Sequence, residues 1–457
     1  MPGPPGMRLL FDRGTIVLLD PASVDACSKL PGFKWDERIS APRFPARFHG
    51  PLVRELHRQR VPFVDEVTGP LDMSLFQPPA VPLRPYQDAA LTAWELSDRR
   101  GLAILPTGAG KTRIAIAAIA RLGLPTLVLV PTRVLLDQWS RAIEQTLGRA
   151  PGRLGDGEHR IEPITVATSE SGWRHMHRLG NHFSFLVVDE AHHFGTGQRD
   201  EALDMCVAPC RLGLTATPPK GPALDGLTER LGPVVYELRV EDLIGEFLAP
   251  FDSVVLRVDF NRAERERYDA WMAVFSEAIA DFRRGHPNGS FKDFAAHAAK
   301  SAAGRRALAA WRQARHLTAF PSAKQALVKT LLRKHRESRT ILFTADNPTA
   351  YAISREHLIM PLTCDIKRAE RDEVLAKFRT GELTALVSAQ VLNEGLDVPD
   401  AEVGIIVAGS KGEREHVQRV GRVLRPSPGK RALVYELVVR ATSEISQGRK
   451  RRSALAA

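Results

Sequence analysis

Short apolar runs alternate with amphipathic stretches through most of this chain. The run 102–105 gives way to a stretch, 113–122, in which Ile114, Ala118 and Leu122 recur at helical spacing. We expect further buried strands at 126–130, 164–168, 185–188, 211–214, 340–343, 383–387 and 403–407, and helices at 134–147 and 369–380. Strands that alternate with helices are typical of parallel sheets, so the pattern predicts an α/β protein with two parallel-sheet lobes.

Three stretches interrupt this alternation. Residues 8–19 read as two short strands around an Asp-Arg-Gly turn, and a helix at 52–60 and a strand at 61–64 follow. Residues 262–316 are helical in character, with a second, basic helix from about 292 to 315. A proline-rich linker at 76–82 and a hinge at 240–250 complete the division. We therefore expect a small N-terminal α+β domain (1–80), a first lobe (81–240) and a second lobe (241–457) with a helical insertion.

Composition narrows the class of protein. The 457 residues are 44% hydrophobic and 26% charged, and no apolar run reaches the roughly 18 residues of a membrane span. With no visible secretory signal and four scattered cysteines, the expected location is the cytoplasm. Cys206 and Cys210 lack partners for a four-ligand metal site, so we expect buried thiols and no metal cluster. The net charge of +11 favours a polyanionic partner.

A phosphate-binding loop is predicted where the strand at 102–105 meets the next helix. The sequence there is Leu-Pro-Thr-Gly-Ala-Gly-Lys-Thr, and its glycines let the backbone curl around an anion at the positive end of a helix. Lys111 is expected on the β and γ phosphates of ATP, and the Thr112 hydroxyl on Mg²⁺. The predicted nucleotide contacts in the loop are Thr107, Gly108, Ala109, Gly110, Lys111 and Thr112. Leu105 stands where the generic pattern has a glycine.

Polar residues follow the later strands of the first lobe. Asp189 and Glu190 come directly after the strand at 185–188, where Asp189 can hold the Mg²⁺ shell and Glu190 can deprotonate the attacking water. His192 is expected to couple the nucleotide to the next loop through the hydroxyls of Thr215 and Thr217.

Upstream of the loop, Gln87 offers a donor and an acceptor to the edge of adenine, and Arg84 can pack on its ring.

Nucleic-acid contacts are predicted in two places. The strand ends at 131–133 and 168 fall on the same rim as the phosphate site, which makes Pro131, Thr132, Arg133 and Thr168 candidates for phosphate contacts. Five cations crowd the second helix of the insertion: Lys300, Arg305, Arg306, Arg312 and Arg315. They form either a DNA-gripping surface or a solvated helical face. The mixture of Trp35, Arg38, Arg43, Arg47 and Phe48 leaves the same two alternatives open.

In the second lobe, the stretch 418–426 reads Gln-Arg-Val-Gly-Arg-Val-Leu-Arg-Pro. Arg422 and Arg425 are three residues apart and so share one helix face, which makes them candidate arginine fingers.

These motifs, in this order, resemble those of a superfamily 2 helicase of the Asp-Glu-Ala-His type, with RecA-like lobes. The second-lobe motifs resemble most closely the archaeal and bacterial XPB family of DNA-repair helicases. The resemblance implies that residues 1–80 are a damage-recognition domain and that 262–316 is a thumb. It also implies nucleotide contacts at Gly395, Asp397, Gln418 and Arg419.

The family resemblance implies a function as well: ATP-driven 3′ to 5′ movement on single-stranded and junction DNA in repair, with a partner nuclease left open. The family's Arg-Glu-Asp element is replaced here by the stretch 218–226, Pro-Pro-Lys-Gly-Pro-Ala-Leu-Asp-Gly. ATP hydrolysis is therefore implied more firmly than duplex opening. A translocase that does not separate strands and an ATP-gated DNA-binding module remain the alternatives.

Overall fold

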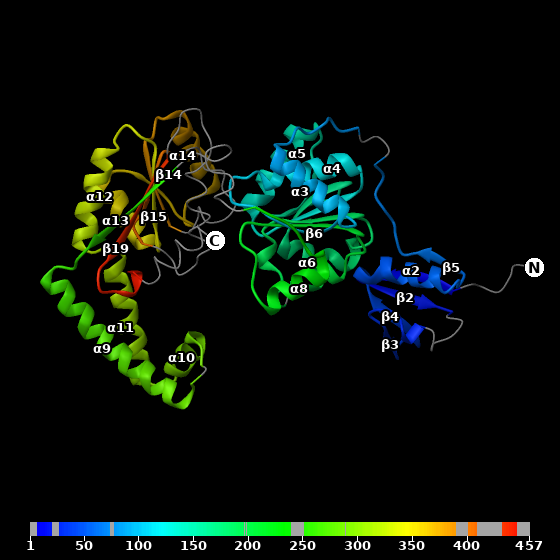
Figure 1. Cartoon of the computed structure of the whole chain (residues 1–457), viewed down its shortest axis with the longest axis horizontal. Coiled ribbons are helices and arrows are strands. Elements are labelled where there is room, and N and C mark those ends of the chain that lie inside the picture. The colour runs from blue at the N-terminus through cyan, green and yellow to red at the C-terminus, as the bar shows by residue number, and fades with distance from the viewer. Residues whose placement is uncertain are drawn as a thin grey trace, which may run out of the picture. The chain divides into compact units, whose positions relative to one another are not determined.

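The computed structural model describes residues 7–20, 27–73, 77–195, 197, 199–238, 251–287, 289–389, 401–408 and 432–445. The chain divides into two compact units, Met1–Arg239 and Val240–Ala457. The first unit holds a small N-terminal domain and an α/β lobe, and the second holds another α/β lobe with a helical insertion (Figure 1).

The N-terminal domain is a five-stranded sheet in the order β3-β4-β2-β1-β5. Strands β1 and β2 form an antiparallel hairpin, and Arg13 takes a left-handed conformation (φ 48°) in the predicted Asp-Arg-Gly turn. The expected hairpin, helix and strand are thus confirmed. The elements are β1 (Met7–Asp12), β2 (Thr15–Leu19), β3 (Lys34–Asp36), β4 (Ala41–Pro45), η1 (Ala46–Phe48), α2 (His49–Arg58) and β5 (Phe63–Glu66).

The first lobe is an eight-stranded sheet in the order β13-β6-β12-β11-β7-β10-β8-β9, in which only β9 runs antiparallel to its neighbour. Its strands are β6 (Arg100–Ile104), β7 (Thr126–Val130), β8 (Gly152–Gly155), β9 (Glu158–Arg160), β10 (Ile164–Thr168), β11 (Phe185–Val188), β12 (Cys210–Thr215) and β13 (Val234–Glu237). The central strands β7, β10, β11 and β12 are buried along their whole length, which explains their continuous apolar runs.

Helices cover both faces of this sheet. Figure 1 shows α3, α4 and α5 on one face and α6 and α8 on the other. The helices of the lobe are α3 (Pro85–Leu96), α4 (Lys111–Leu122), α5 (Arg133–Leu147), α6 (Ser169–Leu179), η2 (Ala191–His193), α7 (Glu201–Asp204) and α8 (Pro222–Leu231). Every strand and helix predicted for this lobe is confirmed, with shifts of a residue or two at the ends.

The second lobe is a six-stranded sheet in the order β14-β19-β18-β15-β17-β16, parallel throughout. Its strands are β14 (Phe251–Val258), β15 (Thr340–Thr344), β16 (Met360–Leu362), β17 (Ala385–Ala389), β18 (Val403–Ile406) and β19 (Ala432–Val439), and its helices are α12 (Ser322–Lys334), α13 (Asn347–His357) and α14 (Arg368–Thr380). The predicted fold class, two parallel-sheet lobes with a small α+β domain and a helical insertion, is confirmed.

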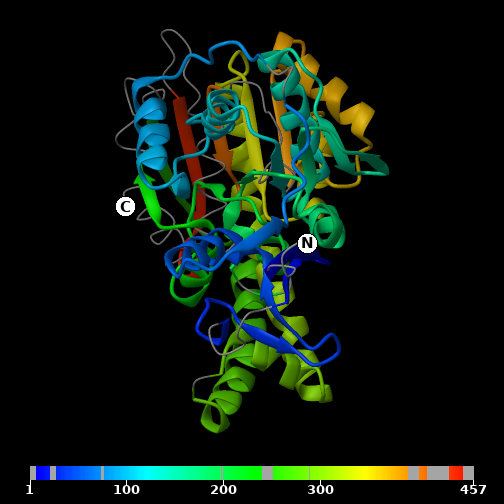
Figure 2. The same cartoon turned by 90° about the vertical axis from the view of Figure 1, so that its right-hand side faces the viewer.

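The insertion consists of three helices, α9 (Arg262–Gly285), α10 (Phe291–Ala298) and α11 (Ala302–Ala319). Helices α9 and α11 run side by side away from the sheet, as both views show (Figures 1 and 2). The prediction of a single basic helix at 292–315 is wrong, because the helix is interrupted between the end of α10 and the start of α11. Ser301 caps α11 by accepting a hydrogen bond from the Gly304 amide at 3.0 Å, and serine favours such a helix start.

Two further expectations concern the cysteines and membrane spans. Cys206 and Cys210 are buried and carry free thiols, and burial raises the pKa of both. Within the described residues, no helix combines the length and the apolar character needed to cross a membrane.

Candidate nucleotide site

The phosphate loop joins the end of β6 to the first turn of α4. Gly108 (φ 89°) and Gly110 (φ 75°) take left-handed conformations that other residues rarely adopt. At Gly110 a Cβ atom would lie 2.4 Å from Gln87 Nε2, so a larger residue there would displace the Gln87 side chain. Among the described residues no side chain caps the start of α4, and its first amides can therefore receive an anion.

Lys111 and Asp189 supply the opposite charges of the site. The partly buried Lys111 ammonium donates a hydrogen bond to the Leu105 carbonyl at 3.3 Å. Asp189 is buried and accepts hydrogen bonds from Trp139 Nε1 at 2.7 Å and from the Glu190 amide at 2.9 Å. Burial raises the pKa of Asp189, and the charge of Lys111 opposes that rise. A bound cation would favour the ionised form, so these residues fit a metal–nucleotide complex.

Glu190 stands at the end of β11 in a strained backbone conformation. Its φ of 46° is left-handed, which is uncommon for a residue with a side chain and occurs both in turns and at functional sites. The Glu190 carboxylate lies 3.4 Å from His192 Nδ1, and the same nitrogen lies 3.1 Å from Thr215 Oγ1. Thr215 Oγ1 also accepts the Thr217 amide at 3.2 Å. The structure thus brings His192 and the Thr215 hydroxyl into contact, whereas Thr217 joins them through its backbone amide and not through its hydroxyl.

Gln87 contacts the phosphate loop in this structure. Its Nε2 donates to the Ala109 carbonyl at 2.8 Å, and its Oε1 accepts the Arg84 amide at 3.0 Å. Tyr86, which sequence reasoning passed over although it lies in the same short stretch, donates to the Ala109 carbonyl at 3.0 Å. An amide nitrogen carries two N–H groups and an amide oxygen accepts two bonds. Adenine recognition by Gln87 and Arg84 stays a prediction. It would use the second N–H group of Gln87 Nε2 and the second acceptor position of Gln87 Oε1.

The predicted DNA rim lies at the ends of the adjacent strands β7 and β10. Thr132 caps α5 by accepting the Leu135 amide at 3.3 Å, and Thr168 caps α6 by accepting the Ser171 amide at 3.2 Å. Arg133 forms an ion pair with Asp156 at 2.9 Å. Pro131, Thr132, Arg133 and Thr168 are therefore close to one another, and their contact with DNA stays a prediction.

The two groups of cations differ in their surroundings. The five basic residues predicted on the insertion are all exposed: Lys300, Arg305, Arg306, Arg312 and Arg315. In the N-terminal domain, Arg38 and Arg43 both pair with Asp36 at 2.9 Å, and Arg47 also lies within ion pairs. The insertion cations are thus more accessible than Arg43 and Arg47, and contact of either group with DNA stays a prediction.

The second-lobe candidates lie outside the described residues and stay predictions. They are Gly395, Asp397, Gln418, Arg419, Arg422 and Arg425.

Three family models match the chain in order. Residues 9–67 match the xeroderma pigmentosum group B helicase damage recognition domain, 80–220 match the type III restriction enzyme res subunit, and 323–427 match the helicase conserved C-terminal domain.

Similar proteins are known as well. The DNA 3′-5′ translocase XPB2 of Sulfurisphaera tokodaii is 34% identical over 92% of this chain and 96% of that protein. The DNA 3′-5′ helicase XPB of Mycobacterium tuberculosis is 28% identical over 78% of this chain, which spans 61% of that longer relative. The crystal structure of the Pyrococcus furiosus Hef helicase domain shares the fold, with a TM-score of 0.52 at 20% identity over 84% of this chain and all of that one.

The contacts around Ala109 predict different losses for two substitutions. Tyr86→Phe removes one hydrogen bond to the loop, so it should weaken the binding of ATP and GTP alike, by about fivefold for about 1 kcal/mol. Gln87→Ala should weaken the binding of ATP more than that of GTP, because it also removes the predicted adenine contact. Titration with fluorescent ATP and GTP analogues measures both ratios. An unchanged preference in Gln87→Ala would show that Gln87 only supports the loop.

Proposed function

This chain belongs to the XPB family of superfamily 2 helicases, and we propose that it couples ATP hydrolysis to 3′ to 5′ movement on DNA and to duplex opening in repair. The observation that carries the proposal is the meeting of Lys111, Asp189, Glu190 and His192 at one edge of the first-lobe sheet. The coupling pair His192–Thr215 contacts Glu190, the proposed base for hydrolysis.

The side chains divide the chemical work between binding and proton transfer. The loop amides and the Lys111 ammonium receive the β and γ phosphates and stabilise the charge of the transition state. Glu190 orients the attacking water and accepts its proton. Its conformation is fixed by the backbone and by the Asp189 carboxylate, which accepts the Glu190 amide.

Thr112 and Asp189 would hold Mg²⁺. The ion, when bound, neutralises the oxygens of the β and γ phosphates. Trp139 fixes one Asp189 oxygen by its 2.7 Å hydrogen bond, which leaves the carboxylate in a defined orientation toward the loop.

DNA, single-stranded or at a junction with duplex, is the proposed polyanionic partner, in keeping with the net charge of +11. Family resemblance alone supports a repair nuclease as a further partner, and cysteine usage supports a cytoplasmic location.

Translocation without strand separation is the second candidate. The stretch 218–226 lacks the family's Arg-Glu-Asp element and instead leads through Gly221 (φ 61°) into the proline-started helix α8. A protein without that element can hydrolyse ATP and move while leaving the duplex closed.

A strand-displacement assay separates the two candidates. The chain should open a duplex with a 3′ tail and leave one with a 5′ tail closed, since movement is expected to be 3′ to 5′. ATP hydrolysis with no displacement on either substrate would favour the translocase.

Glu190→Gln keeps the shape of the side chain but removes the base, so this variant should bind ATP and DNA yet hydrolyse ATP about 10² to 10⁴-fold more slowly. Loss of ATP binding in Glu190→Gln would assign that residue to nucleotide or metal binding.

The insertion is proposed to grip DNA through its exposed cations. Replacing Lys300, Arg305, Arg306, Arg312 and Arg315 by alanine should lower the slope of log affinity against log salt by about 0.7 for each phosphate of single-stranded DNA that these cations neutralise. ATPase activity at saturating DNA should persist, because the first-lobe site is unchanged, while strand displacement should fall more steeply.

A matched control replaces the exposed Lys329 and Arg333 of α12, which also removes positive charge from the second unit. This control should leave the salt slope and displacement unchanged. An unchanged slope in the five-residue variant would make the insertion a solvated helical face.

A further inference from the structure

One arginine of the N-terminal domain contacts two helices of the first lobe, in addition to the hydrogen bonds that Val67 and Gly69 make with Asn181. Arg47, in η1, is mostly buried, with a side chain 13% exposed, and its guanidinium lies over the Phe48 ring at 4.2 Å. Its Nε lies 2.8 Å from Asp204 Oδ1, and its Nη2 lies 2.6 Å from Glu229 Oε1. Asp204 ends α7 and Glu229 lies in α8, so a single side chain of the N-terminal domain contacts two helices of the lobe.

Apolar contacts reinforce this attachment. Val207, two residues beyond the C-cap of α7, is 3% exposed and belongs to the hydrophobic core of the N-terminal domain. At Gly14 a Cβ atom would lie 2.3 Å from Met205 Cγ, so the β1–β2 turn packs directly on the C-cap residue of α7. The end of α7 therefore follows the position of the N-terminal domain.

A buried cation locks the ends of α7 and α8 to each other. The Arg211 guanidinium is fully buried and donates to the carbonyls of Leu203 and Arg230 at 2.9 and 3.0 Å, and also to those of Cys206 and Ala208. Burial lowers the pKa of Arg211 to about 10, so it stays charged at neutral pH. Arg230 in turn pairs with Asp204 at 3.1 Å. Movement at Asp204 is thus shared by both helices.

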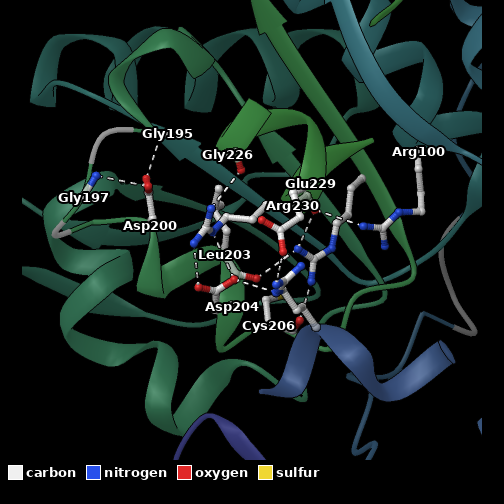
Figure 3. Close-up of polar contacts among 12 residues, drawn as sticks. Arg100, Gly195, Gly197, Asp200, Leu203, Asp204, Cys206, Gly226, Glu229 and Arg230 are labelled. Carbon is white, nitrogen blue, oxygen red and sulfur yellow. Dashed lines mark hydrogen bonds and ion pairs between the residues drawn. The ribbon is translucent and has the colours of Figure 1, made fainter. Parts of the chain in front are cut away.

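The other end of α7 holds the segment that follows the catalytic residues. Asp200, which precedes α7, accepts the Gly195 amide at 2.7 Å and the Gly197 amide at 3.2 Å (Figure 3). Helix α7 has four residues, so Asp200 and Asp204 are one turn apart.

Gly195 is confined from α8 as well. It is left-handed (φ 92°), and a Cβ atom there would lie 2.2 Å from the Ala223 carbonyl. The preceding 3₁₀ turn starts at Glu190, whose carbonyl accepts the His193 amide at 3.0 Å. A series of contacts therefore leads from the Arg47–Asp204 ion pair through α7 to Gly195, beside the turn that carries His192.

We propose that Arg47 and Asp200 are positioning residues for ATP hydrolysis, and that the N-terminal domain sets the rate at the first-lobe site through the contacts Arg47–Asp204 and Asp200–Gly195. The inference rests on the proposed ATPase function. It implies that a ligand which shifts the N-terminal domain alters the catalytic rate constant, since this relay of contacts ends at Gly195, next to the 3₁₀ turn that follows Glu190, rather than at the phosphate loop.

Steady-state ATPase of the full chain with saturating DNA tests the relay. Arg47→Ala should lower kcat about three- to tenfold and change the KM for ATP less than twofold. Asp200→Ala should do the same, and the double variant should be no worse than the lower single, because both act on one route. Arg8→Ala is the matched control, since it removes the Arg8–Glu66 ion pair within the N-terminal domain and leaves the lobe contacts intact. Its kcat should equal that of the wild type.

Hydrogen exchange gives a readout that needs no ATP hydrolysis. The Gly195 amide should exchange several-fold faster in Arg47→Ala than in the wild type or in Arg8→Ala. If Arg47→Ala does not fold, Arg47→Lys and Glu229→Gln replace it, and each should show a smaller change in the same direction. An unchanged kcat with unchanged exchange, or losses that multiply in the double variant, would overturn the relay. If the wild type hydrolyses no ATP but the Gly195 amide still exchanges faster in Arg47→Ala, the proposed function is refuted and the mechanical link between the two sites stands.

Discussion

Parallel pairing of four buried strands is the constraint on which the chemistry of the first lobe depends. Thr215 of β12 pairs with Ile104 of β6, and Val188 of β11 pairs with both Gly213 and Leu129. The phosphate loop, the Asp189–Glu190 pair and the Thr215 loop therefore emerge at the same edge. A slip of one residue in β11 would turn its alternate side chains to the other face and displace Asp189 from Lys111. Catalytic geometry is thus fixed by strand register before any side chain makes a contact.

The sequence was informative where one local pattern determined one element. Continuous apolar runs predicted the buried strands. The glycine-rich stretch after β6 predicted a turn whose left-handed backbone conformations favour glycine. The polar residues after each strand predicted the rim of the site, because parallel strands end together. The second lobe was predicted less completely. The long pair β14 and β19 was not foreseen, since Asp252, Ser253 and Arg257 interrupt the apolar run of β14 and Glu436 interrupts that of β19.

Long-range polar contacts were beyond sequence reasoning. Trp139 lies on the buried face of α5, and no local pattern links its ring nitrogen to Asp189. Arg47 looked like part of a surface cation cluster, yet its partners Asp204 and Glu229 belong to another domain. Ser301 is a local case: it lies in an alanine-rich stretch that was read as one helix, and its bond to the Gly304 amide caps the start of α11. In each case the deciding interaction is one specific contact rather than a repeated pattern.

The proposed activity on DNA depends on a phosphate site at Lys111. The most direct measurement is DNA-stimulated ATP hydrolysis by Lys111→Ala, with DNA affinity measured on the same preparation. A charge positioned on the transferred phosphate should contribute more than the ~1.4 kcal/mol that a tenfold change represents. The account predicts activity below about a tenth of wild type with DNA affinity retained. Activity above that level in a folded variant would contradict it.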